Sequence, residues 1–390
     1  MHICFVSQEY PPETGWGGIG AYTYEMARGL AGAGHSVTVI SLAVTEETIQ
    51  TVGGVVVHRI LPQPDISSMR LIWRLNRYWP GFAWAALQRV RQVHAKQKID
   101  LIEAAENRAD GFFISFAANI PPVMVRLHTA WIFVDQGDGL PANLRQRFLY
   151  WLEKRVILRA NAVSSPSEAM AVRTRAWVHR PGAGVSIVPN PIDTRAYTPG
   201  TEARGRDVVF IGRLQRRKLA PLEQALPALL ARCPETLFRF FGDDTRDEHG
   251  ESYKARLMRA AGLQQHRLVF ALLPREDVKT WYQSAALCLM PSLWENFPYT
   301  TLEAMACGAA VIASRCGGIP EMVEDGVSGI LFDPGHPEQL VDAVVALLGD
   351  PARCAELGRA ARQRVEDLYA VDRVVQQMLP VYQAMIAAAA

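Results

Sequence analysis

The chain alternates between short runs of apolar, often β-branched residues and longer stretches in which apolar residues recur at helical spacing. A first group of runs predicts strands at 2–6, 36–40, 55–60, 101–102, 123–127 and 186–188, and a second group predicts strands at 208–211, 237–241, 268–270, 287–290, 310–313 and 330–332. Helices are expected between them, for example at 20–33, 142–159, 219–231 and 338–348. Strands that alternate with helices are typical of parallel sheets covered on both faces, and continuous apolar strands fit that burial. The pattern therefore predicts an α/β protein.

The two groups of strands are separated by a segment without a periodic apolar face. Pro189 and Pro191 prevent a helix there, and the stretch 198–206 that follows is polar. At 390 residues the chain is also longer than one ordinary core supports. We therefore expect two Rossmann-like domains, over residues 1–190 and 191–371. Ligands should bind at the carboxyl ends of their strands, in the cleft between the domains.

Composition narrows the class of protein. Apolar residues make up 49% of the chain and charged residues 21%, and no apolar run approaches the roughly 20 residues that span a bilayer. The N-terminal sequence reads as a strand and lacks the basic flank and cleavage site of a signal peptide. The six cysteines form no Cys-x-x-Cys pair, and a net charge of +2 argues against a dedicated nucleic-acid binder. We expect a reduced, cytoplasmic protein.

Two local clusters of basic and aromatic residues stand out against the nearly neutral net charge. The first, at 70–98, lies in a span without acidic residues between Asp65 and Asp100, and the second covers 145–159. Solvated helix faces with aromatic core contacts explain both clusters. The alternative is a surface that meets anionic lipid headgroups or an anionic acceptor, which would place the protein peripherally on the inner face of the membrane.

The segment 291–308 carries the strongest candidate site. It follows a predicted strand, and Pro298 ends its loop before a helical stretch begins at Thr300. A loop at the carboxyl end of a strand that leads into a helix offers backbone N–H groups and a positive dipole to an anion. Glu295 and Glu303 flank this position, and carboxylates accept hydrogen bonds from sugar or ribose hydroxyls. A solvated surface explains either glutamate alone, but the two together favour a ligand site.

Two cations follow the first strand of the second group. Arg213 comes directly after Gly212 at the end of strand 208–211, and Lys218 follows five residues later. Arginine offers planar bidentate contact and lysine a point charge, so the pair suits a diphosphate. A merely basic loop is the alternative, because two further arginines lie between them.

The first domain offers a glycine-rich loop and one histidine. Gly15, Gly17 and Gly20 satisfy G-x-G-x-x-G, but they begin eight residues after the first strand, and no acidic residue ends the second strand. A dinucleotide site is therefore disfavoured, although such a loop still lets backbone amides approach a phosphate. His128 follows strand 123–127 on the side expected to face the cleft, where a purely structural histidine is the more frequent case.

Together these segments resemble glycosyltransferase family 4, a group of retaining enzymes with the two-domain GT-B fold. The family signature is two glutamates separated by seven residues, and Glu295 and Glu303 have that spacing in a loop-to-helix context. The resemblance covers nearly the whole chain and is strongest over 207–335. It implies that the parallel sheets of the two domains face each other across a cleft. It also implies that the last helix, about 372–390, crosses back to complete the N-terminal, acceptor-side domain.

The resemblance implies a role for each candidate residue. It assigns the ribose hydroxyls of the donor to Glu303 and hydroxyls of the donor sugar to Glu295. His128 is expected to contact the donor sugar, and Arg213 and Lys218 to stabilise the departing nucleoside diphosphate. The other donor-binding positions that it implies are Gly17, Gly18, Gly212, Asn296, Phe297, Pro298, Tyr299 and Thr300. The pair Gly317-Gly318 also matches the family, although a tight turn explains it equally well.

The expected reaction is transfer of a hexosyl group from a UDP-, GDP- or ADP-linked sugar to a hydroxyl of a saccharide, a lipid-linked saccharide or a small molecule. The resemblance implies retention of the anomeric configuration. The chain has no Asp-x-Asp, Walker, H-E-x-x-H or G-x-S-x-G motif, so we expect no metal and no other cofactor. Three alternatives stay open: a nucleotide-sugar epimerase of GT-B fold, an inverting transferase with His128 as general base, and a non-catalytic binding subunit.

Overall fold

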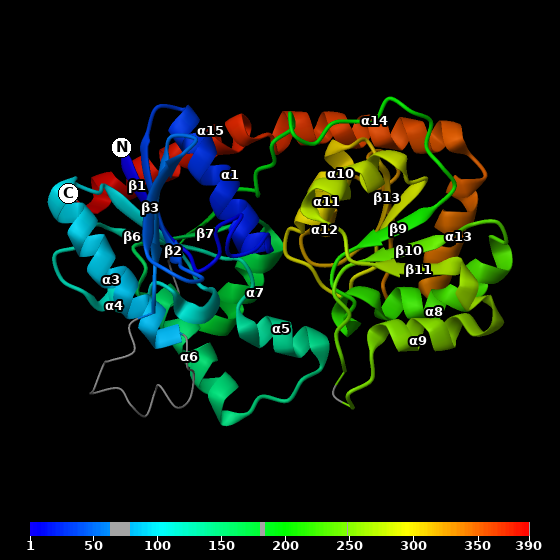
Figure 1. The fold of residues 1–390 in the computed structure, drawn as a ribbon, viewed down its shortest axis with the longest axis horizontal. Helices are drawn as coiled ribbons and strands as arrows, with labels where there is room; N and C mark the ends of the chain where they lie inside the picture. Colours follow the sequence, from blue (N-terminus) through cyan, green and yellow to red (C-terminus); the bar gives the residue numbers. More distant parts are fainter. Residues whose placement is uncertain (63–78, 180–183, 248, 390) are drawn as a thin grey trace. The chain divides into compact units, whose positions relative to one another are not determined.

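The computed structural model describes residues 1–62, 79–179, 184–247 and 249–389 of the chain. They form two compact units (Figure 1). Unit 1 comprises Met1–Gln136, Pro141–Pro191 and Val371–Ala390, and unit 2 comprises Gly137–Leu140 and Ile192–Ala370. Each unit has a sheet and a buried apolar core of its own.

The sheet of unit 1 has the strand order β3-β4-β2-β1-β5-β6-β7-β8 in the described part of the chain. Neighbouring strands are parallel except β3 and β4, which form an antiparallel pair at one edge. The central strands are buried along their whole length because helices cover both faces of the sheet. This burial explains why their sequences are almost continuously apolar. The strands are β1 (His2–Val6), β2 (Ser36–Leu42), β3 (Thr48–Val52), β4 (Val55–Ile60), β5 (Leu101–Ala105), β6 (Val123–Arg126), β7 (Ala162–Ser165) and β8 (Val185–Ile187).

The helices of unit 1 include the first and the last helix of the chain, α1 and α15, which pack side by side (Figure 1). Gly29 of α1 permits this approach, because a Cβ there would lie 2.3 Å from Cγ1 of Val371. Six residues of α15 at helical spacing are buried. The helices are α1 (Gly18–Gly32), α3 (Trp79–Lys96), α4 (Phe112–Phe116), α5 (Trp131–Asp138), α6 (Leu144–Arg159), α7 (Glu168–Val178) and α15 (Val371–Ala389).

The sheet of unit 2 is parallel, with the order β11-β10-β9-β12-β13-β14. The order reverses direction between β9 and β12, and such a switch point is where open α/β sheets bind ligands. The strands are β9 (Val208–Ile211), β10 (Phe238–Phe241), β11 (Leu268–Ala271), β12 (Leu287–Met290), β13 (Ala310–Ser314) and β14 (Ile330–Phe332). The helices are α8 (Arg216–Arg232), α9 (Tyr253–Ala261), α10 (Arg275–Ser284), α11 (Tyr299–Ala306), α12 (Ile319–Met322), α13 (Pro337–Leu348) and α14 (Pro351–Leu368).

The two mostly parallel sheets confirm the predicted α/β fold class. The predicted strands are present, but the apolar pattern of the sequence does not predict β3 and β7. Most of β3 is exposed, and β7 reads Ala-Val-Ser-Ser, so neither has the apolar run that marks a buried strand. Of the basic aromatic cluster at 70–98, residues 70–78 lie outside the described residues.

Candidate active site

Glu295 lies in the loop that follows β12, and only 9% of its surface is exposed. The Nζ of Lys218 lies 3.2 Å from its Oε1, and the hydroxyl of Ser292 donates to the same oxygen at 3.0 Å. Nη1 of Arg217 lies 3.9 Å from Oε2. Burial alone would raise the pKa of Glu295, but Lys218, Arg217 and Ser292 outweigh it and hold that pKa below its ordinary value. Glu295 is thus a buried, ionised carboxylate within a cationic surround.

The backbone of Glu295 is fixed by two glycines. Gly317 has φ +52°, and a Cβ there would lie 1.8 Å from the carbonyl oxygen of Glu295. The N–H of Gly318 donates to that same oxygen at 3.0 Å. Glycine at 317 is therefore a structural requirement of the loop, because no side chain fits there.

Lys218, Gly212 and Arg213 lie where β9 leads into α8. A Cβ at Gly212, which has φ +150°, would meet Nζ of Lys218 at 3.5 Å, so glycine leaves room for the ammonium group beside the backbone. Lys218 itself stands in the first turn of α8, which begins at Arg216. Arg213 is exposed, and within the described residues its guanidinium makes no hydrogen bond or ion pair. Lys218 is held by Glu295, whereas Arg213 is free to meet an anion.

Glu303 lies on α11 and is 1% exposed. Arg275 forms an ion pair with its Oε1, and the hydroxyl of Tyr197 donates to the same oxygen at 3.3 Å. Its other oxygen, Oε2, has no hydrogen-bond partner in the part of the chain that the structure describes. Burial would lower the pKa of Arg275, but Glu303 outweighs it and raises that pKa above its ordinary value. The carboxylate therefore has one oxygen occupied by a cation and one oxygen left to accept a hydrogen bond.

The residues between the two glutamates build the start of α11. Asn296 and Phe297 are buried, and the ring of Phe297 packs edge-on against Tyr369 at 5.4 Å. Pro298 is the N-cap residue and supplies no side-chain cap. The first N–H groups of a helix have no intrahelical acceptor, so Tyr299 and Thr300 stand at a helix end suited to an anion.

In unit 1, the glycine-rich loop leads directly into α1, with Gly17 as N-cap residue and no side-chain cap. A Cβ at Gly20 would lie 2.7 Å from the carbonyl oxygen of Gly15, so this glycine serves the packing of the loop. A Cβ at Gly18 would meet no atom within 4 Å. Gly18 therefore opens the helix N-terminus to its surroundings.

His128 follows β6 and is half-buried. Its backbone N–H donates to both carboxylate oxygens of Glu106 at 2.8 Å, and the ring of Tyr22 from α1 meets its imidazole edge-on at 5.2 Å. Burial, assisted by Arg126, lowers the pKa of His128 well below its ordinary value, so the imidazole is neutral at neutral pH.

Unit 2 thus brings together three predicted residues, Gly212, Lys218 and Glu295. Glu303 belongs to a different cluster, with Arg275. In unit 1, Tyr22 links the helix that carries Gly17 and Gly18 to His128. Sequence reasoning missed Arg275, although its place after Pro274, at the start of a helix that follows a strand, is a signal that could have found it.

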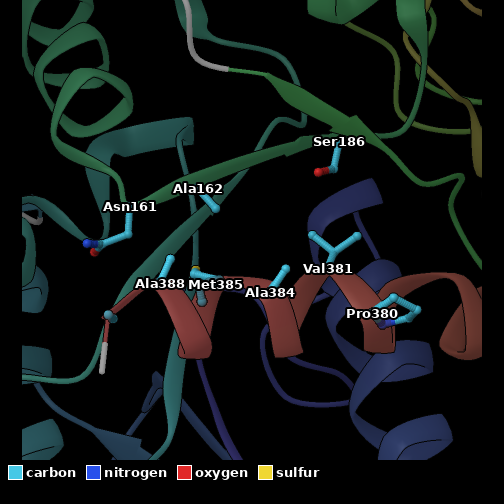
Figure 2. A pocket seen from close by; sticks show the side chains of 9 residues that line it. Asn161, Ala162, Ser186, Pro380, Val381, Ala384, Met385 and Ala388 are labelled. Atoms are coloured by element: carbon cyan, nitrogen blue, oxygen red, sulfur yellow. The ribbon is translucent and has the colours of Figure 1, made fainter.

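Two other features bear on cofactors and pockets. Among the described residues, no group of three or more His, Cys, Asp or Glu side chains is arranged to hold a metal ion. A groove of about 500 Å³ lies in unit 1 between α15 and strands β7 and β8 (Figure 2). Small and apolar side chains of α15, such as Ala384 and Met385, line it opposite Ala162 and Ser186, and none of the predicted site residues does.

Comparisons with known proteins place the chain in a class. The model described as Glycosyltransferase Family 4 matches residues 16–196, and the model described as Glycosyl transferases group 1 matches residues 205–350. Among solved structures, sucrose-phosphate synthase from Thermosynechococcus elongatus aligns over 99% of both chains with a TM-score of 0.77 and 22% identity. HepE from Anabaena, solved with UDP-glucose, aligns over 98% of this chain and 100% of its own with a TM-score of 0.71 and 22% identity.

Curated relatives point the same way. D-inositol 3-phosphate glycosyltransferase from Kribbella flavida is 28% identical over 82% of this chain and 79% of that protein. An uncharacterized glycosyltransferase from Methanocaldococcus jannaschii is 24% identical over 98% of both chains. The fold is therefore GT-B, as expected from the sequence. The chain belongs to glycosyltransferase family 4, within the group 1 glycosyltransferases, and it is a transferase of glycosyl groups.

Proposed function

We propose that this glycosyltransferase moves a hexosyl group from a nucleoside-diphosphate sugar to an acceptor hydroxyl with retention of configuration and without a metal. The observation that carries the proposal is the pair of buried glutamates on either side of the α11 N-terminus. Glu303 keeps one oxygen for a ribose hydroxyl, and Glu295 lies beside Lys218 where the donor sugar and its phosphates would meet. A nucleoside-diphosphate sugar needs both kinds of contact.

The charge that develops on the leaving diphosphate is met by cations and by a helix end. As the bond between C1 of the sugar and the β-phosphate oxygen breaks, negative charge grows on the phosphate. Arg213, Lys218 and the first N–H groups of α11 would stabilise it more in the transition state than in the ground state. The acceptor oxygen bonds to C1 on the face that the phosphate leaves, and the acceptor proton passes to that phosphate.

Retention is favoured over an inverting reaction by the state of His128. An inverting transferase needs a general base, which works best when its pKa lies near the working pH. Burial holds the pKa of His128 well below its ordinary value, so the neutral imidazole is a weak base. We propose instead that His128 contacts the donor sugar.

The experiment begins with a thermal-shift panel of UDP, GDP and ADP and their glucose and mannose conjugates, since a bound ligand stabilises the folded state by mass action. UDP and ADP compounds are included because the related HepE was solved with UDP-glucose and a starch synthase IV with ADP. The donor so identified is then used with saccharide acceptors, and proton NMR reads the anomeric configuration of the product. An inverted anomer contradicts retention, an epimerised donor without acceptor indicates an epimerase, and loss of turnover in EDTA contradicts the metal-free reaction.

Arg213→Ala tests the charge on the leaving group. We expect kcat to fall on the order of 100-fold, as for loss of one preorganised donor to a developing charge. Because the side chain is exposed and unpaired among the described residues, the melting temperature should not change. Arg232→Ala, on the same unit and half-exposed in an ion pair with Asp342, is the matched control. An unchanged kcat would remove Arg213 from the mechanism.

The acceptor side carries an aromatic stripe on α4 and α6 that suits an anionic membrane surface. Phe148, Trp151, Phe112 and Phe116 follow one another through ring contacts of 4.9 to 6.4 Å, and Trp151 and Phe116 are 45% and 47% exposed. Guanidinium groups lie over the exposed rings, Arg155 over Trp151 at 5.2 Å and Arg159 over Phe116 at 4.2 Å. The acidic residue of α6, Glu153, is buried. Aromatic side chains between cations match the headgroup region of anionic lipid.

Vesicle sedimentation tests this contact. We expect binding to vesicles of phosphatidylglycerol and phosphatidylcholine, little binding to phosphatidylcholine alone, and loss of binding in Trp151→Ser combined with Arg155→Ser. Trp281→Ser in unit 2 is the aromatic control. No helix in the described ranges has the length and apolar character to cross a bilayer. Equal binding of the double variant, or no binding at all, contradicts a membrane contact through this stripe.

A further inference from the structure

A buried carboxylate in unit 1 accepts hydrogen bonds from side chains of the first and the last helix of the chain. Glu103 lies on β5 and is 2% exposed. The hydroxyl of Tyr22 on α1 donates to its Oε1 at 2.7 Å, and the hydroxyl of Tyr382 on α15 donates to its Oε2 at 2.6 Å. Burial raises the pKa of both tyrosines well above the ordinary value, so the two hydroxyls stay protonated donors. Glu103 therefore ties the first helix of the chain to the last.

A buried guanidinium completes the cluster. Arg126 stands at the end of β6, is fully buried, and pairs in register with Ala105 of the neighbouring strand β5. Its Cζ lies 4.5 Å from the centroid of the Tyr22 ring, and its Nη2 donates to Asn190 at 2.9 Å. The contact of Arg126 with the Tyr22 ring is a cation–π interaction, and such interactions are strongest when the cation is desolvated. The ring of Tyr22 is therefore held at its hydroxyl by Glu103 and at its face by Arg126.

The ring of Tyr22 also packs against the imidazole of His128. The two rings are 5.2 Å apart in an edge-to-face arrangement, with an interplanar angle of 69°. The backbone of His128 is held separately, by the two hydrogen bonds of its N–H to Glu106. The main chain of His128 is thus fixed by Glu106, and its imidazole packs against the ring of Tyr22.

We propose that Glu103, Tyr22 and Tyr382 form a positioning network that sets the orientation of the His128 ring, so that the C-terminal helix acts on the chemical step through one hydroxyl. This rests on the proposed contact of His128 with the donor sugar. All three side chains are buried, so they would act as positioning residues and not as catalytic ones. Their effect is expected in kcat, because a reacting group misplaced by a fraction of an ångström slows the chemistry while nucleotide binding by unit 2 continues.

The test uses Tyr382→Phe and Tyr22→Phe in the full chain. Each removes one oxygen and keeps the ring. We expect kcat to fall about 10-fold in each, with KM for the donor and the dissociation constant for the nucleoside diphosphate within about twofold of wild type. Tyr369→Phe is the matched control, because it also removes a buried tyrosine hydroxyl bond, to the carbonyl of Glu321, but lies in unit 2. It should lower stability without changing kcat.

A double-mutant cycle decides whether the effect passes through His128. In a His128→Ala background, Tyr382→Phe should have no further effect on kcat, since coupled residues are non-additive. If His128→Ala itself lowers kcat, the same tenfold loss in that background, or wild-type kcat in Tyr382→Phe, overturns the network.

An independent readout separates this proposal from the proposed function. The imidazole proton shifts of His128 sense the ring current of Tyr22, so Tyr382→Phe should move them in the free protein, and Tyr369→Phe should not. If His128→Ala retains wild-type kcat, the role of His128 in the proposed function fails. The proton shifts still report whether Tyr382 orients the ring. Unmoved shifts in Tyr382→Phe would contradict the network whatever the kinetics.

Discussion

At the residue scale, the two signature glutamates differ in how their charge is balanced. Glu295 has both oxygens near cations, whereas Glu303 has Oε1 paired with Arg275 and Oε2 without a partner among the described residues. A buried acceptor without a partner costs free energy unless a ligand satisfies it. The arrangement is that of a carboxylate prepared for one incoming hydroxyl.

Glu303→Gln therefore should weaken binding of the nucleoside diphosphate about 10-fold or more, because a hydrogen bond to a charged acceptor contributes about 1.5–3 kcal/mol. Arg275→Met removes the counter-charge of Glu303. It should lower the melting temperature and should reduce the affinity for the nucleotide less than Glu303→Gln does. Calorimetric titration with the nucleotide chosen by the thermal-shift panel measures the first effect, and thermal unfolding the second. Wild-type affinity in Glu303→Gln would exclude the ribose contact.

Glu106 gives unit 1 a pH-dependent stability. Burial raises its pKa from an ordinary value of 4.5 to about 7, although hydrogen bonds from the backbone of His128 and Thr129 oppose the rise. A carboxyl with a raised pKa binds its proton more tightly in the folded state. The free energy of unfolding therefore falls as the pH rises from about 4.5 to about 7, and the contribution is fully lost above that window.

Glu106→Gln keeps one acceptor oxygen and removes the titration. Denaturant unfolding at pH 5 and pH 7.5 should show a smaller loss of stability in the variant than in the wild type, by up to about 3 kcal/mol. Part of the slope should persist, because burial raises the pKa of Asp110 to about 7 as well. Identical slopes in variant and wild type would show that Glu106 does not titrate in this range.

At the scale of elements, the hydrophobic pattern is sufficient to predict the central strands. It does not predict strands that are exposed or that bury polar residues. β3 is an exposed edge strand, and β7 buries two serines, Ser164 and Ser165. The segment 291–308 was found because its loop, proline and helix are contiguous in sequence. The ion pair of Arg275 with Glu303 joins residues on different helices, and the bond of Tyr382 to Glu103 spans most of the chain. No local pattern encodes such pairs, because only the order of the strands brings them together.

The N-terminus of α1 provides a test in which stability and activity move in opposite directions. A methyl group at Gly18 meets nothing within 4 Å, and alanine in a helix is more stable than glycine by roughly 0.5–1 kcal/mol. Gly18→Ala should therefore raise the melting temperature. If the donor phosphate approaches this helix end, the same methyl group should lower kcat/KM by about 10-fold.

Gly32→Ala at the other end of α1 is the matched control, since a Cβ there also meets nothing within 4 Å. It should stabilise the protein similarly and leave turnover unchanged. Equal kinetics in the two variants would indicate that no ligand approaches Gly18.

At the scale of the whole molecule, the chain has two hydrophobic cores, and its last helix, α15, packs in unit 1. Deleting residues 371–390 removes six buried side chains from unit 1: Val371, Val374, Val375, Met378, Tyr382 and Met385. At about 1.5–3 kcal/mol each, their loss is roughly 9–18 kcal/mol, which is comparable with the entire stability of a domain. Unit 1 of the truncated chain should therefore unfold, whereas unit 2 keeps its own core and its Glu295 and Glu303 clusters.

Hydrogen exchange followed by mass spectrometry distinguishes the units. In the truncated chain, amides of β1, β5 and β6 should exchange within the dead time of the experiment, while those of β9, β12 and β13 stay protected. Calorimetry should still detect nucleoside-diphosphate binding. Deletion of residues 387–390 alone is the control, because Ala387, Ala388 and Ala389 are exposed and their loss should leave protection unchanged. Loss of protection in both units together would mean that unit 2 depends on unit 1 for its stability, and that the two cores fold as one cooperative system.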